Sequence, residues 1–135
     1  MKVLRNVNLL LILLLSLSCT TPDKQQPTIE RVDVNAFEDK LNNLDNSVLI
    51  DVRTPDEYKS GHIDGATNID FNQTDKMKMA FEKLDHNQPM LIYCAAGGRS
   101  NRTRILMAEM GFTQVYELSS GMSGWEAAGK PISLK

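Results

Sequence analysis

The sequence predicts an α/β domain with a mainly parallel, buried central sheet. Short apolar runs of the buried-strand type recur along the chain, and segments with helical periodicity separate them. The chain has 135 residues and is 41% hydrophobic, which suits one globular domain with one core.

The first predicted helix and the first predicted strand precede residue 53. A short helix is predicted through Leu41. Asp33 can cap its start, and Phe37 and Leu41 lie four residues apart on one helical face. Residues 48–52 then form an apolar run typical of a buried strand.

The next segment carries a helix start and a helix stop. Thr54 occupies a cap position, proline follows at the first helical position, and Glu57 stands at the third, which is a capping-box pattern. Gly61 suits the end of this helix. Residues 66–69 are then a short strand candidate.

The second half of the chain continues the alternation. The predicted strands are residues 90–93 and 114–118, and the predicted helices are residues 73–84, 100–110 and 121–128. We therefore expect ligands to bind at the carboxyl ends of the strands, as they do in other open parallel sheets.

The N-terminal segment, residues 1–19, resembles a bacterial lipoprotein signal peptide. Two basic residues near the start precede the apolar run 9–15, which is too short to span a bilayer. Cys19 ends a segment that resembles a lipoprotein processing box, although Ser16 stands where leucine is commonest. The resemblance implies lipidation of Cys19; an ordinary signal peptide with a chance cysteine is the alternative.

Residues 20–30 are expected to form a flexible tether, because they are polar and contain Pro22 and Pro27. Residues 31–135 are then the globular domain. Acyl chains on Cys19 would hold that domain at a membrane without a spanning helix. We therefore expect a lipid-anchored protein of the bacterial cell envelope, with its domain facing the periplasm or the exterior.

Charge and cysteine usage exclude several functions. The formal net charge is −2 with no basic excess, which disfavours nucleic acid as a partner. The two cysteines, Cys19 and Cys94, form no CxxC motif, so no dithiol redox site or cysteine-based zinc site is expected. We expect the protein to need no cofactor and no metal.

The residues that carry chemistry follow the predicted strand 90–93. Cys94 leads into Ala95, Ala96, Gly97, Gly98 and Arg99, and a helix begins near Ser100. Glycine lets a backbone turn so that successive N–H groups point at one spot, and a helix N-terminus adds positive potential there. Such a loop favours an anion, lowers the pKa of a thiol and makes it nucleophilic. A buried, inert cysteine is the alternative.

Several segments, in this order, resemble a rhodanese, or sulfurtransferase, domain from about Val32 to Lys135. They are residues 49–58, 61–69, 93–100, 111–116 and 121–125. The resemblance implies a rhodanese-like three-layer domain with a mainly parallel central sheet flanked by helices. In the matching motif, His62 is expected to be structural.

The resemblance also implies a mechanism. Cys94 attacks the outer sulfur of a donor such as thiosulfate or a polysulfide, holds that sulfur as a persulfide, and passes it to cyanide or a thiol. The amides of residues 95–99 cradle the persulfide, and Asp51, Arg53 and Ser100 support the site. Arg99 is expected to close the loop and to pair with Asp51. A protein thiol carrier is a further candidate partner.

Other functions remain open at this point. The loop from Cys94 to Arg99 spans six residues, which suits one sulfur atom, whereas phosphatase and arsenate-reductase relatives of this fold use seven. Many members that use thiosulfate carry a basic residue after the cysteine, where this chain has Ala95. A membrane-anchored persulfide-binding or sensing module with little turnover is therefore the alternative to an enzyme.

Overall fold

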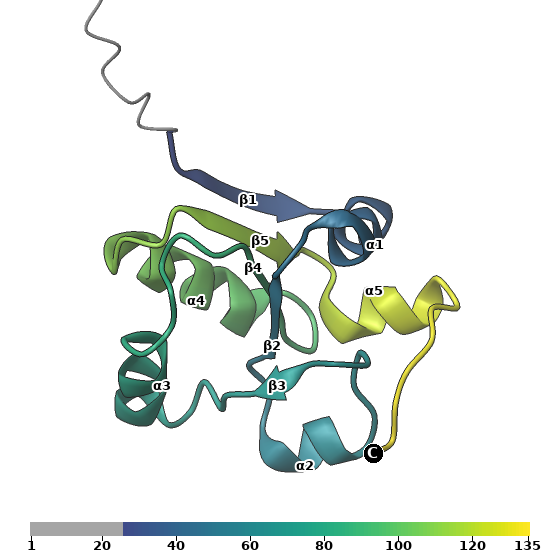
Figure 1. Cartoon of the computed structure of the whole chain (residues 1–135). Helices are drawn as coiled ribbons and strands as arrows, with labels where there is room; N and C mark the ends of the chain where they lie inside the picture. The colour runs from purple at the N-terminus through teal and green to yellow at the C-terminus, as the bar shows by residue number, and fades with distance from the viewer. Residues whose placement is uncertain (1–25) are drawn as a thin grey trace, which may run out of the picture.

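A computed structural model of the chain describes residues 26–135 and shows five parallel strands with helices on both faces (Figure 1). The strands lie in the order β1-β5-β4-β2-β3. They are β1 (Thr28–Val32), β2 (Val48–Asp51), β3 (Thr67–Asn68), β4 (Met90–Tyr93) and β5 (Gln114–Leu118). The helices are α1 (Val34–Asn43), α2 (Pro55–Lys59), α3 (Thr74–Phe81), α4 (Gly98–Glu109) and α5 (Gly121–Ala127). The predicted fold class is confirmed.

The core has two parts, one on each face of the sheet. Helices α3 and α4 cover one face, where Met77, Phe81 and Met107 pack against β2, β4 and β5. Helices α1 and α5 cover the other, where Phe37 and Trp125 meet edge to face with ring centroids 6.2 Å apart. Each such side chain contributes about 1.5–3 kcal/mol when fully buried. The central strand β4 is buried along its whole length, which explains its unbroken apolar run.

Helix caps form where the sequence predicts them. The Asp33 side chain accepts the backbone N–H of Ala36 at 2.9 Å. Thr54 and Glu57 form the complete capping box at the start of α2. Element ends differ from expectation by a few residues: α4 begins at Gly98 rather than at Ser100. Helix ends are uncertain by one or two residues, and Gly97 at the start of α4 offers no side-chain cap that would mark the start in the sequence.

Strand β1 corrects the predicted boundary between tether and domain. The structure places Thr28–Val32 in a parallel pairing with β5, in the register Thr28↔Gln114 to Val32↔Leu118. The last residues of the expected tether, 28–30, therefore belong to the domain. Backbone pairing, which needs no apolar run, holds this half-exposed edge strand in place.

The predicted signal peptide 1–19, the lipidation site Cys19 and most of the expected tether lie outside the described residues. Within residues 26–135, no helix is long and apolar enough to cross a membrane.

Candidate active site

Cys94 lies directly after β4, at the carboxyl edge of the sheet, where the sequence predicts it. Its side chain is buried, and the loop curls around it so that the Gly97 N–H donates to Cys94 Sγ at 3.1 Å. Gly97 has φ +90°, and a β-carbon there would lie 2.1 Å from the Ser119 carbonyl oxygen. Only glycine therefore lets the loop pass this point without displacing its neighbours.

Helix α5 holds the loop from the other side. The N–H groups of Met122 and Ser123 donate to the carbonyl oxygens of Cys94 and Ala95, at 2.8 and 3.0 Å. These bonds turn the loop's first carbonyl groups toward α5. A β-carbon at Gly121 would lie 2.6 Å from the Cys94 carbonyl oxygen, so this close approach also requires glycine.

The surroundings of Cys94 favour its thiolate. Burial raises the pKa of the thiol, but hydrogen bonds from the Ser100 hydroxyl and from the amides of Ser100, Ala96 and Gly97 outweigh burial, and the pKa lies below its ordinary value. The amides of Ala96, Gly97 and Ser100 therefore converge on Sγ. The loop can thus bind an anion without a basic side chain of its own between residues 94 and 99.

The expected pairing of Arg99 with Asp51 is wrong. Arg99 instead binds Glu57 of α2 in a two-pronged ion pair, with Nη1–Oε2 at 2.8 Å and Nη2–Oε1 at 2.7 Å. The guanidinium of Arg99 lowers the pKa of Glu57 to about 2, against an opposing effect of burial, and the Thr54 N–H adds to the lowering. Arg99 therefore ties the end of the active-site loop to α2.

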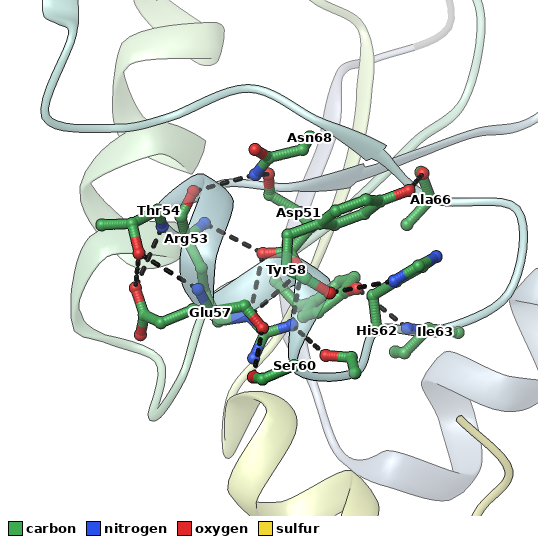
Figure 2. Close-up of polar contacts among 12 residues, drawn as sticks. Asp51, Arg53, Thr54, Glu57, Tyr58, Ser60, His62, Ile63, Ala66 and Asn68 are labelled. Atoms are coloured by element: carbon green, nitrogen blue, oxygen red, sulfur yellow. Dashed lines mark hydrogen bonds and ion pairs between the residues drawn. The ribbon is translucent and has the colours of Figure 1, made fainter. Parts of the chain in front are cut away.

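Asp51 and Arg53 pair with one another (Figure 2). Arg53 Nη2 lies 2.7 Å from Asp51 Oδ2, and the Arg53 backbone N–H donates to Asp51 Oδ1 at 2.9 Å. Arg53 Nη2 also donates to the Gly61 carbonyl oxygen at 2.6 Å. Both side chains are buried and neither hydrogen-bonds Cys94, so the pair fixes the turn from β2 into α2 rather than contacting the sulfur.

His62 also belongs to this structural network (Figure 2). Its ring stacks on Tyr58 with centroids 3.8 Å apart, and Nδ1 lies 3.0 Å from the Tyr58 carbonyl oxygen. Its backbone pairs with Ser133, which ties the C-terminal segment to the domain. These contacts agree with the structural role expected for His62.

Sequence reasoning missed two residues near the site, Glu117 and Arg31. Ser100 Oγ lies 3.3 Å from Cys94 Sγ, as a supporting residue should, but it also lies 2.6 Å from Oε1 of the fully buried Glu117. Glu117 Oε2 in turn accepts from Arg31 Nε at 2.6 Å. The one signal available was a lone charged residue inside the apolar strand 114–118.

Comparison with known proteins agrees with this geometry. Residues 33–128 match the Rhodanese-like domain family. The thiosulfate sulfurtransferase PspE of Escherichia coli is 38% identical over 66 residues, which are 49% of this chain and 62% of PspE. The thiosulfate sulfurtransferase GlpE of Coxiella burnetii is 35% identical over 80 residues, 59% of this chain and 72% of GlpE. The match to YqhL of Bacillus subtilis, 36% identical over 77 residues, covers 57% of this chain and 59% of YqhL.

Solved structures show the same fold. The Alr3790 protein from Anabaena superposes with a TM-score of 0.66 at 26% identity, over 76% of this chain and 81% of that one. A rhodanese-related protein from Thermoplasma volcanium superposes with a TM-score of 0.68 at 20% identity, over 78% of this chain and 99% of that one. Against PspE and YqhL, the matched segments span less than two thirds of the curated relative.

Proposed function

Because this chain belongs to the Rhodanese-like domain family, we propose that it is a sulfurtransferase that carries sulfane sulfur on Cys94. The observation that carries the proposal is the loop itself: a buried thiol receives the Gly97 N–H at 3.1 Å and lies within reach of Ser100. A thiol with a lowered pKa in a cup of amides is suited to nucleophilic attack on sulfur. Relatives named thiosulfate sulfurtransferases support the assignment.

The reaction has two balanced steps. In the first, the Cys94 thiolate attacks the outer sulfur of thiosulfate, a sulfur–sulfur bond forms, and sulfite leaves with the electron pair of the broken bond. The persulfide then carries the negative charge on its outer sulfur, where the loop amides stabilise it. In the second step, cyanide or a thiolate attacks that sulfur, and Cys94 leaves as the thiolate.

The size of the loop favours sulfur over phosphate. Cys94 to Arg99 are six residues, and the loop amides lie close around one sulfur atom, so a tetrahedral oxyanion has less room than in a seven-residue loop. Arg99, whose guanidinium would bind a phosphate oxygen, is committed to Glu57 through both of its terminal nitrogens. Both features disfavour phosphatase or arsenate-reductase activity.

The donor is thiosulfate or a polysulfide. Ala95 offers no positive charge, and two nearby arginines are engaged elsewhere: Arg102 lies 4.7 Å over the Phe71 ring, and Arg104 binds Asn101. We therefore expect a polysulfide, whose attacked sulfur bears no sulfonate group, to load Cys94 at least as fast as thiosulfate. Cys94 is the only cysteine of the domain, so the persulfide must pass to an outside acceptor, either a small thiol or a protein thiol carrier.

A persulfide-binding or sensing module with little turnover is the second candidate. It is favoured by the same absence of a basic side chain between Cys94 and Arg99, because such a module would load slowly from an anionic donor. Both candidates hold sulfur on Cys94, and they differ in whether repeated turnover follows.

The experiment uses the full chain with Cys19→Ser, so that Cys94 is the only thiol. The protein is incubated with thiosulfate or polysulfide and weighed intact for one added sulfur, then given cyanide while thiocyanate is followed. A persulfide with repeated turnover, both absent in Cys94→Ser, supports the enzyme. A persulfide without turnover favours the binding module, and no added sulfur from either donor contradicts both.

The proposal includes a location. The positive start, the apolar run 9–15 and Cys19 support a lipid anchor that holds the domain at a membrane of the bacterial cell envelope. Cys19→Ala should move the protein from the membrane fraction to the soluble fraction and remove the mass of the acyl chains. Cys94→Ser is the matched control and should stay with the membrane; an unchanged mass in Cys19→Ala would contradict the anchor.

A further inference from the structure

A continuous chain of polar contacts joins the edge of the sheet to the active-site sulfur. It runs from Arg31 of β1 to Glu117 of β5, from Glu117 to Ser100 of α4, and from Ser100 to Cys94 at the end of β4. The distances are 2.6 Å for Arg31 Nε–Glu117 Oε2, 2.6 Å for Glu117 Oε1–Ser100 Oγ, and 3.3 Å for Ser100 Oγ–Cys94 Sγ.

The burial of the Glu117 carboxylate costs free energy. Its side chain is fully buried in β5, whose neighbouring residues Val115, Tyr116 and Leu118 are also buried. An isolated carboxylate in such surroundings costs several kcal/mol, so it needs both a charge partner and hydrogen-bond donors. Arg31, its register partner on β1, supplies the opposite charge at 2.6 Å.

Ser100 has one hydrogen to give and two acceptors within reach. A serine hydroxyl donates a single hydrogen bond. At 2.6 Å the Glu117 oxygen lies within the distance range of a charge-assisted O–H···O⁻ bond, and Sγ at 3.3 Å lies within hydrogen-bond range of a sulfur acceptor. We propose that Glu117 is a positioning residue that competes with the Cys94 sulfur for the hydroxyl hydrogen of Ser100.

The competition changes with the state of the sulfur. While Cys94 is a thiol, Ser100 donates to Glu117 and its oxygen accepts the S–H. When the thiol proton leaves to solvent, the hydroxyl hydrogen turns toward the anionic sulfur and Glu117 keeps only Arg31. Glu117 thereby raises the energy of the thiolate. The thiolate is less stabilised and more nucleophilic than the loop amides and Ser100 together would make it.

The persulfide reverses the exchange, a step that rests on the proposed function. Its charge lies on the outer sulfur among the loop amides, so Sγ no longer needs the hydroxyl and Ser100 returns its hydrogen to Glu117. Glu117 therefore disfavours the free thiolate relative to the persulfide. It favours loading of Cys94 without touching the donor.

The test measures the pKa of Cys94 from the ultraviolet absorbance of its thiolate, in the full chain with Cys19→Ser and no sulfur donor. In Glu117→Gln, the side-chain oxygen must face the Arg31 N–H, so its NH₂ group donates to Ser100 and frees the hydroxyl hydrogen for sulfur. The pKa of Cys94 should fall by about one pH unit. Ser100→Ala should raise it instead.

The double variant separates competition from simple charge repulsion. Removing the Glu117 charge also lowers the thiol pKa directly, and that effect would persist without Ser100. In the Ser100→Ala background, Glu117→Gln should therefore have much less effect than in the wild type. Among residues 26–135, Arg31 and Arg99 also interact electrostatically with Cys94, and Arg99 is paired with Glu57. All four proteins retain these charges and the Arg53–Asp51 pair.

An equal fall in pKa in both backgrounds would overturn the proposal, and so would an unchanged or raised pKa in Glu117→Gln. If Glu117→Gln does not fold by circular dichroism, Glu117→Leu fills the same space and leaves the half-exposed Arg31 to solvent, with the same expected fall. The pKa of Cys94 is measured without a sulfur donor. If Glu117→Gln lowers it as expected but the protein forms no persulfide, only the proposed sulfur transfer is contradicted.

Discussion

The ion pair between Arg99 and Glu57 should stabilise the fold in a pH-dependent way that Glu57→Gln removes. Glu57 has its pKa lowered to about 2 from an ordinary 4.5. Without solvent screening, this lowering would correspond to about 3 kcal/mol. The Glu57 side chain is 34% exposed, so solvent screening reduces the expected contribution to about 1 kcal/mol.

The sign follows from the direction of the pKa change. A carboxyl group whose pKa is lowered by folding stabilises the folded state fully above its unfolded pKa, and this stabilisation is lost as pH falls through the folded value. Wild type should therefore exceed Glu57→Gln by about 1 kcal/mol at neutral pH. The difference should shrink between pH 4.5 and about pH 2.

The assay is urea unfolding of both proteins at a series of pH values. Asp56→Asn is the matched control: it removes a carboxylate from the same helix whose side chain makes no hydrogen bond or ion pair within residues 26–135. It should follow the wild type to within about 0.5 kcal/mol. A stability difference for Glu57→Gln that stays constant down to pH 2 would refute the assigned role of the ion pair.

Further predictions concern the loop, its support and its thiol. Gly97→Ala should destabilise the protein by about 2 kcal/mol or more, because its β-carbon would meet a carbonyl oxygen at 2.1 Å, whereas Gly98→Ala, with open space around it, should change stability by less than about 0.5 kcal/mol; urea unfolding compares them. Asp51→Asn should cost about 3–5 kcal/mol in the same assay by leaving the Arg53 charge buried without its partner, and near-wild-type stability would contradict the buried pair. The rate of Cys94 alkylation should rise with pH with its midpoint below pH 9.0, as a lowered thiol pKa requires; a profile centred at or above 9.0 would contradict it.

The loop and the capping box could be predicted because their information is local. The thiol, the two glycines and the helix start occupy seven consecutive residues, 94–100, and the backbone they require follows from residue type. The capping box at Thr54 is likewise contained in four residues. Neither depends on how distant segments meet.

The partners of the charged residues depend on distant segments, and there the sequence was insufficient. Asp51 and Arg99 both lie near the carboxyl edge of the sheet, as expected. Arg53, however, is two residues from Asp51 and binds it with both backbone and side chain, while Arg99 lies in the first turn of α4 and binds Glu57 of α2. Placing residues at the same edge of a sheet does not determine which of them pair.

Strand β1 was not predicted from the sequence, for a related reason. Residues 28–32, Thr-Ile-Glu-Arg-Val, follow a proline-containing polar segment and carry no continuous apolar run. Their place is set by pairing with β5, more than eighty residues away, and by the ion pair of Arg31 with Glu117. The five residues of β1 alone do not indicate the strand with which they pair or the register of that pairing.

The direction of β1 also determines where the chain enters the domain relative to the thiol. Because β1 runs parallel to β5 and β4, it enters the sheet at the end opposite Cys94, about 16 Å away by the rise of a five-residue strand. A group fused ahead of Thr28, such as a second domain, is therefore joined to the domain at the edge of the sheet opposite Cys94. A group attached directly at Thr28 would therefore leave the carboxyl edge of the sheet, and with it the active-site loop, uncovered.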